Sequence, residues 1–141
     1  MRATYETLET LTAERAFMQR YESAFGCRCE KLPRRYSVDC AIMQSGTVTG
    51  WLELKCRTHT INRYPGYWLS LAKFFYGCSL SERTGAPFVL AVAFSDCDAR
   101  LVCSALRRDQ WGISFGGRYD RGDPEDCEPL AVLPINLFTT F

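Results

Sequence analysis

The sequence has little of what several common classes of protein need. Its 141 residues include one histidine, His59, which argues against most zinc hydrolases and Ser-His-Asp enzymes, because both usually need several imidazoles or a partnered one. No apolar run approaches the roughly 20 residues of a membrane span, and the N-terminal stretch MRATYETLETLTAERAF contains no apolar signal segment. We therefore expect a cytoplasmic protein with no membrane partner.

The eight cysteines lack the spacing of a zinc ribbon. Cys27 and Cys29 form a CxC pair, and none of the other six falls into a CxxC pair. Without a signal segment, the thiols are expected to stay reduced and to pack as small hydrophobic groups. The net charge of +1 favours no class of partner, since binding nucleic acid requires only a local basic groove.

The sequence does contain enough apolar material for one folded unit. It is 47% hydrophobic and 13% aromatic, and a chain of this length buries about two-thirds of its unfolded surface. It shows no internal repeat, linker or low-complexity segment. We expect a single α/β domain over residues 1–141.

Hydrophobic periodicity predicts the order of the elements. Thr12 is a suitable N-cap for a helix that runs to Phe25 and stops at Gly26. Its apolar stripe consists of Phe17, Met18, Tyr21 and Phe25, and Glu14 lies on the same stripe, where it favours the helix dipole or serves a site. Strands are predicted at residues 27–32, 36–43, 51–57, 88–94 and 99–106, and a second helix at residues 67–83 with a stripe of Trp68, Leu71, Ala72 and Phe75.

The stretch VDCAIMQSGTVTGWLELKCR, residues 38–57, reads as a hairpin with charged residues on one face. Residues 44–50 would connect two strands whose even-numbered positions are apolar, from Tyr36 to Ile42 and from Leu52 to Cys56. Asp39 and Glu53 then share the opposite face with Lys55 and Arg57.

Two neighbouring carboxylates repel each other, and a divalent cation relieves that repulsion. Oxygen ligands from Asp39 and Glu53 suit Mg²⁺ or Mn²⁺, which complete their coordination with water and phosphate oxygens. Lys55 lies two residues after Glu53, and so within reach of a bound water or of developing negative charge. An ordinary cross-strand ion pair on a solvated sheet face is the competing interpretation.

Asp39, followed after a hairpin by Glu53-Leu54-Lys55 and preceded by a helix bearing Glu14, resembles the PD-(D/E)XK nuclease superfamily, and in particular its small phage-borne members. The resemblance covers roughly residues 10–106, with Val38 in place of the proline of the motif. It implies a restriction-endonuclease-like core, in which a mixed central sheet is flanked by helices.

The resemblance also implies roles for single residues. Asp39, Glu53 and the Leu54 carbonyl would bind Mg²⁺, with Mn²⁺ as a substitute, and Lys55 would orient the attacking water. Glu14 would be an outer acid or a ligand of a second metal. Arg57, Ser70 and Lys73 would bind the phosphates of the DNA substrate. The implied activity is metal-dependent DNA hydrolysis in phage recombination, repair or processing, in the host cytoplasm.

Two alternatives remain open at this stage: a nuclease fold without catalysis that binds DNA, and a phage structural or host-interaction protein on an unrelated α/β fold. The C-terminal segment LPINLFTTF could form a homodimer interface or close the sheet. The loop RYDRGDPEDCEP, residues 118–129, is a self-paired surface turn or a gate over the substrate. Trp111 and Tyr119 are core residues or stack on bases, and His59 is a surface residue or a phosphate contact.

Overall fold

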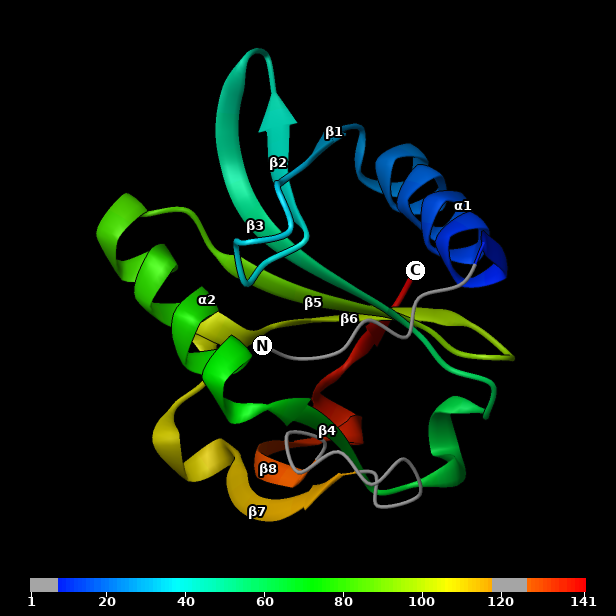
Figure 1. Ribbon diagram of the computed structural model, residues 1–141, viewed down its shortest axis with the longest axis vertical. Coiled ribbons are helices and arrows are strands. Elements are labelled where there is room, and N and C mark those ends of the chain that lie inside the picture. Colours follow the sequence, from blue (N-terminus) through cyan, green and yellow to red (C-terminus); the bar gives the residue numbers. More distant parts are fainter. Residues whose placement is uncertain (1–7, 118–126) are drawn as a thin grey trace.

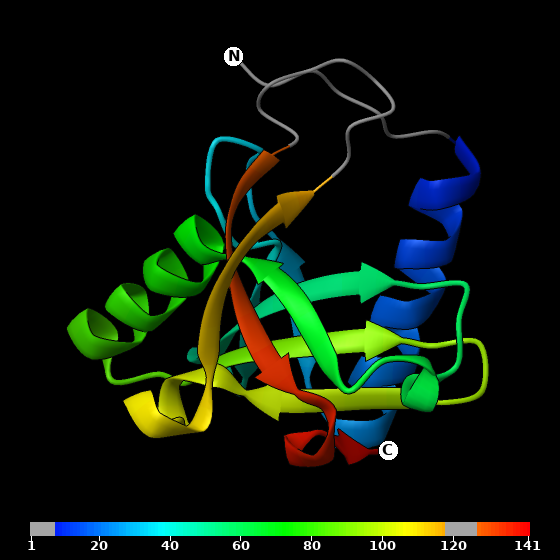
Figure 2. The ribbon, with the colours of Figure 1, turned by 90° about the horizontal axis from the view of Figure 1, so that it is seen from below.

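The computed structural model describes residues 8–117 and 127–141 (Figure 1). Its centre is a mixed six-stranded sheet in the order β1-β2-β3-β5-β6-β9. One apolar cluster lies between this sheet and helix α1 (Leu8–Phe25), and a second lies between the sheet, helix α2 (Leu71–Thr84) and a small three-stranded sheet. Figure 2 shows α1 on one side of the central sheet and α2 with the small sheet on the other.

Helix α1 packs through the predicted stripe. Phe17 and Tyr21 are fully buried, and Met18 and Phe25 pack partly buried beside them. Gly26 follows in the left-handed conformation with φ 60°, which confirms the predicted stop. The predicted N-cap is wrong, because the Thr12 hydroxyl donates to the Leu8 carbonyl within the helix at 2.8 Å.

The hairpin is longer than its sequence indicated. Strands β2 (Cys40–Gln44) and β3 (Thr47–Cys56) are joined only by Ser45 and Gly46, whose φ angles of 51° and 75° are those of a tight hairpin turn. The predicted connection at residues 44–50 is therefore wrong. Gly50, which reads as a turn residue, lies within β3, where an added Cβ would come 2.9 Å from the Ile42 side chain.

The first hairpin strand also starts later than predicted. The chain enters β2 only at Cys40, so the alternation expected from residue 36 does not hold for the residues before it. Tyr36 is 43% exposed, and Val38 packs in the cluster on the α2 side. Cys40 and Ile42 pack on the α1 side, as do Leu52 and Leu54 of β3.

The central strand of the sheet lies where the sequence predicts it. Strand β5 (Phe88–Ala93) has every residue buried, and it lies parallel to β3 and antiparallel to β6 (Asp98–Val102). This confirms a central strand covered on both faces. Strand β1 (Arg28–Lys31) forms the predicted edge beside β2. Strand β6 ends at Val102, before the predicted limit of 106, because Cys103–Ala105 forms a 3-10 turn.

The second predicted helix begins four residues late. Residues 67–70 belong to strand β4 (Gly66–Ser70), in which Tyr67 and Leu69 are buried while Trp68 points outward. Within α2, Phe74 and Gly77 face the core, so the predicted stripe through Phe75 is wrong. An added Cβ at Gly77 would lie 2.4 Å from the Phe88 ring, and the missing side chain thus lets α2 approach β5 closely.

Strand β4 belongs to a sheet that the sequence did not predict. It pairs with β8 (Cys127–Pro134), which pairs in turn with β7 (Gly112–Gly117), all antiparallel. Trp111 lies in the core beside Phe74, with ring centroids 4.5 Å apart. Residues 118–126, and with them Tyr119 and most of the predicted loop, lie outside the described residues.

The C-terminal segment closes the central sheet. After a 3-10 turn at Ile135–Leu137, β9 (Thr139–Thr140) pairs with β6, and Phe141 packs against the rings of Phe17 and Tyr21. In the part of the chain that the structure describes, no disulfide bond joins the cysteines. No helix among those residues is long and apolar enough to cross a membrane.

Candidate active site

The pairing of β2 with β3 brings two acidic residues face to face. Cys40 is the register partner of Leu52, and the next residue back, Asp39, donates its backbone N–H to the Leu52 carbonyl at 3.1 Å. Asp39 therefore lies opposite Glu53, where side chains of an antiparallel pair come closest. The Asp39 carboxylate accepts a hydrogen bond from the Leu54 backbone N–H at 2.8 Å, which fixes its position beside β3.

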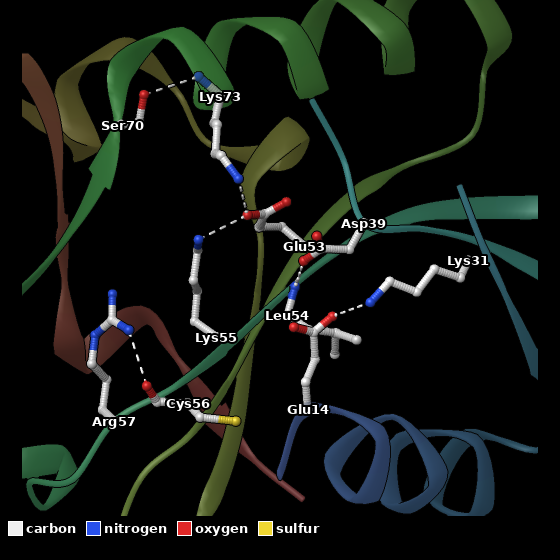
Figure 3. Close-up of polar contacts among 10 residues, drawn as sticks. All are labelled: Glu14, Lys31, Asp39, Glu53, Leu54, Lys55, Cys56, Arg57, Ser70 and Lys73. Atoms are coloured by element: carbon white, nitrogen blue, oxygen red, sulfur yellow. Dashed lines mark hydrogen bonds and ion pairs between the residues drawn. The ribbon is translucent and has the colours of Figure 1, made fainter. Parts of the chain in front are cut away.

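Glu53 is the one fully buried charged side chain among the described residues. Its Oε2 accepts from Lys73 Nζ at 2.7 Å and forms an ion pair with Lys55 Nζ at 3.1 Å. Figure 3 shows the two lysines converging on this oxygen from α2 and from β3. The other oxygen, Oε1, is buried and has no hydrogen-bond partner in the described part of the chain. A buried anionic oxygen without a partner is costly, which marks this position as a candidate ligand atom.

Asp39 resists ionisation. Burial, together with the negative charge of Glu53, raises the pKa of the Asp39 carboxyl to about 6, and the bond from the Leu54 N–H offsets part of that rise. Lys73 and Glu14 add smaller opposing contributions. Asp39 and Glu53 are thus electrostatically coupled, and a cation between them would favour the ionised form of both.

Lys73 reaches the site from the first turn of α2, and its amine contacts Glu53. Burial lowers the pKa of Lys73, but the charge and hydrogen bond of Glu53 outweigh that effect, so the pKa is raised and Lys73 stays cationic. Ser70 caps α2, its hydroxyl accepting from the Lys73 backbone N–H at 3.4 Å. The start of this helix therefore lies next to the acidic pair.

Glu14 lies near the site and is held by a residue that the sequence analysis missed. Lys31, in edge strand β1, forms an ion pair with Glu14 at 2.9 Å. The register partner of Lys31 is Cys40, so this lysine lies next to Asp39 along the sheet. The sequence offered no local signal for this pair, because it depends on how α1 packs against β1.

Arg57 lies apart from the ion network of Glu53. It follows the end of β3, its guanidinium donates to the Cys56 carbonyl at 3.0 Å, and its Cζ lies 5.1 Å from the centre of the Tyr67 ring. Figure 3 shows Arg57 beyond Lys55, away from Asp39 and Glu53. The structure thus brings Asp39, Glu53, Lys55 and Lys73 together and leaves Arg57 at the rim.

The donor set fits a hard divalent cation. No group of three or more His, Cys, Asp or Glu side chains gathers at metal-binding distance among the described residues. Two opposed carboxylates are nevertheless what Mg²⁺ usually takes from a protein, since it retains water and binds substrate phosphate. The partnerless Glu53 Oε1 and the raised pKa of Asp39 both fit a site that a cation would complete.

Known proteins share the sequence pattern and the fold of this chain. The whole chain, residues 1–141, matches the model of a family described as "Phage putative PDDEXK endonuclease". None of the curated proteins matches it. Among solved structures it is similar to Hjc, a Holliday junction resolvase from the archaeal hyperthermophile Archaeoglobus fulgidus, with a TM-score of 0.53 and 14% identity over 69% of this chain and 75% of that chain. This likeness confirms the restriction-endonuclease-like core and excludes an unrelated α/β fold.

Proposed function

The chain belongs to a family of phage PD-(D/E)XK endonucleases, and from that premise we propose that it is a metal-dependent deoxyribonuclease that hydrolyses DNA phosphodiester bonds. The observation that carries the metal dependence is the buried Glu53 Oε1, which has no partner among the described residues and lies beside a carboxyl with a raised pKa. The setting we propose is phage DNA recombination, repair or processing in the host cytoplasm.

Asp39, Glu53 and the Leu54 carbonyl would hold Mg²⁺ or Mn²⁺. The bound cation would polarise the scissile phosphate and lower the pKa of a water molecule. Leu54 is well placed for this role, because its backbone N–H already bonds to the Asp39 carboxylate. Glu14, paired with Lys31, would be an outer acid that adds negative charge near the site.

The lysines would bind the attacking water and the phosphate of the substrate. Paired with the Glu53 carboxylate, Lys55 is a hydrogen-bond donor, so it would orient the attacking water and offset charge that develops on the phosphate. Water would attack phosphorus in line, and the bond to the leaving oxygen would break. Lys73 and Ser70, at the start of α2, would hold a phosphate oxygen, because helix N-termini favour anions. Arg57 would hold a neighbouring phosphate.

A second candidate function has one observation in its favour. Lys55 and Lys73 already offset the charge of Glu53 without a metal ion. They would do the same in a DNA-binding module that keeps the acidic residues for structure. This candidate predicts DNA binding without cleavage, and a melting temperature that Mg²⁺ and Mn²⁺ do not change.

A cleavage assay separates the two functions. The purified protein is incubated with plasmid, linear duplex, branched and single-stranded DNA in Mg²⁺, Mn²⁺ or chelator. We expect cleavage with either metal, none in chelator, and none by Asp39→Asn. The matched control is Asp109→Asn, which removes a carboxylate that is 75% exposed and paired with Arg107. Metal-independent cleavage, or equal cleavage by Asp39→Asn, would contradict the proposed function.

A further inference from the structure

A pocket of about 440 Å³ opens beside the end of β3, where Arg57 lines it and neither Asp39 nor Glu53 does. Its volume lies within the range of roughly 300–1,000 Å³ that is usual for small-ligand sites. Of the residues that line it, the function proposed above uses only Arg57. The side chains that define its chemistry are Arg57, His59, Tyr64, Tyr67, Trp68 and Phe94.

The walls of the pocket are aromatic and its charged groups are basic. The His59 ring packs edge-on against Tyr64 at 5.0 Å and lies 5.6 Å from Phe94, so the wall is built from contacting rings. Tyr64 and Trp68 are about half exposed, and each presents ring surface to solvent. Arg63 lies over the Tyr64 ring at 4.9 Å, and no acidic side chain among residues 8–117 and 127–141 lines the pocket.

Tyr67 places a buried hydroxyl close to the Arg57 guanidinium. The residue is 5% exposed, and its hydroxyl is buried without a hydrogen-bond partner in the described part of the chain. A buried hydroxyl normally finds a partner, since leaving it unpaired costs stability. The Arg57 guanidinium lies 5.1 Å from the Tyr67 ring centre, and its charge opposes the rise in the Tyr67 pKa that burial causes, so the two residues act together in the wall of the pocket.

Arg57 connects the pocket to the catalytic strand. It lies two residues after Lys55, a step of about 6.8 Å along an extended strand. A DNA strand whose phosphates contact Lys55 and Arg57 would therefore carry one base past the pocket mouth. Aromatic side chains bind such a base by stacking, which every base can provide.

We propose that this pocket takes one unstacked base of the DNA strand being cut, so that the preferred substrate carries an unpaired nucleotide beside the scissile phosphate. The proposal rests on the proposed function in taking DNA as the substrate and the acidic pair as the place of cleavage. A base in continuous duplex must first leave the stack to enter the pocket, whereas a base that is already unpaired avoids that cost.

Binding in chelator tests the pocket without any cleavage. Fluorescence anisotropy would compare a labelled duplex with the same duplex carrying one unpaired nucleotide. We expect the wild type to bind the second DNA at least 5-fold more tightly. Trp68→Ala should lose about 5- to 100-fold in affinity for the unpaired-nucleotide DNA and change less than 2-fold for the duplex. The matched control is Phe75→Ala, an aromatic residue with the same 52% exposure outside the pocket, and it should change neither affinity.

Tyr67→Phe is a second variant that should fold normally, because it removes a hydroxyl with no partner among the described residues. We expect an unchanged or higher melting temperature and about 2- to 10-fold weaker binding of the unpaired-nucleotide DNA. Equal wild-type affinity for the two DNAs, or equal losses on both DNAs in Trp68→Ala, would overturn the proposal. Selective binding without any cleavage would instead overturn only the proposed function.

Discussion

Two neighbouring residues of β3, Leu52 and Glu53, are both fully buried, and they point to opposite faces of the central sheet. Leu52 packs among the apolar side chains under α1, whereas Glu53 faces two lysines on the side of α2. Burial of Leu52 stabilises the fold, while burial of a carboxylate costs several kcal/mol unless partners offset it. Both faces carry an apolar cluster that stabilises the fold, and the α2 face also holds the buried charge of Glu53, which packing alone would not require.

The largest effect should come from breaking the α1 face. Leu52→Ala removes a fully buried side chain, and we expect the free energy of unfolding to fall by about 4 kcal/mol. Chemical denaturation measures this loss. The cleavage rate per folded molecule should remain close to wild type at a temperature where the variant is folded. A loss of cleavage larger than the loss of folded protein would mean that packing on the α1 face also controls the active site on the α2 face.

On the α2 face, Lys55→Ala should act on chemistry instead. If Lys55 orients the water and offsets developing charge, its removal should lower the cleavage rate about 10²- to 10³-fold. Single-turnover kinetics at saturating enzyme isolates this effect from binding. Arg107→Ala, which removes a cation that is 73% exposed, is the control and should cleave normally. A Lys55→Ala rate within 3-fold of wild type would contradict the assigned role.

Asp39→Asn should raise the free energy of unfolding, whereas most substitutions at buried positions lower it. The raised pKa of Asp39 means that its contribution to stability is present below pH 4 and is lost as the pH rises through about 6. In chelator at pH 7, the variant should therefore be more stable than wild type by about 2–3 kcal/mol, with the difference vanishing near pH 4. Thermal melts across this pH range measure it.

The same variant should lose the stabilisation that Mn²⁺ or Mg²⁺ gives to the wild type, because a carboxamide is a poorer ligand for a hard cation. Asp109→Asn again serves as the control. A less stable Asp39→Asn beside a wild type that does not respond to metal would identify the acidic pair as part of a structural ion network.

The smallest effect is expected for Lys73→Ala. Lys73 is 34% exposed but pairs with the fully buried Glu53, which keeps Lys55 as a partner, so stability should fall by about 1–2 kcal/mol. Duplex binding in chelator should weaken, and the slope of log affinity against log salt should fall by about one. Arg83→Ala, at the other end of α2, is the control. An unchanged salt slope would remove Lys73 from the phosphate contacts.

The shared face of Glu53 and Lys55 was predictable because a strand has a period of two. Once residues 51–57 form a strand, Glu53 and Lys55 must share a face, whatever the exact ends of the hairpin. This inference holds wherever the turn lies. The turn itself was placed wrongly, because Gly50 reads as a turn residue but packs against Ile42 within β3. Lys73 was also placed near the site, although its helix begins four residues later than predicted.

What the sequence did not predict depends on contacts between distant segments. Strand β4 pairs with β8, far along the chain, and its short alternating pattern merges with that of the following helix. The Lys31–Glu14 ion pair arises where α1 crosses β1, and no local pattern encodes that crossing. The aromatic pocket likewise joins the end of β3, β4 and Phe94, three segments that meet only in the folded chain.

Gly77 has a consequence far from its own contacts. With only hydrogen where a Cβ would meet the Phe88 ring at 2.4 Å, it sets how deeply α2 sits on the sheet. Lys73 stands about one turn earlier on the same helix, so the reach of its amine to Glu53 depends on that depth. The missing side chain at Gly77 therefore helps to set the distance between the Lys73 amine and the Glu53 carboxylate, although Gly77 contacts neither group.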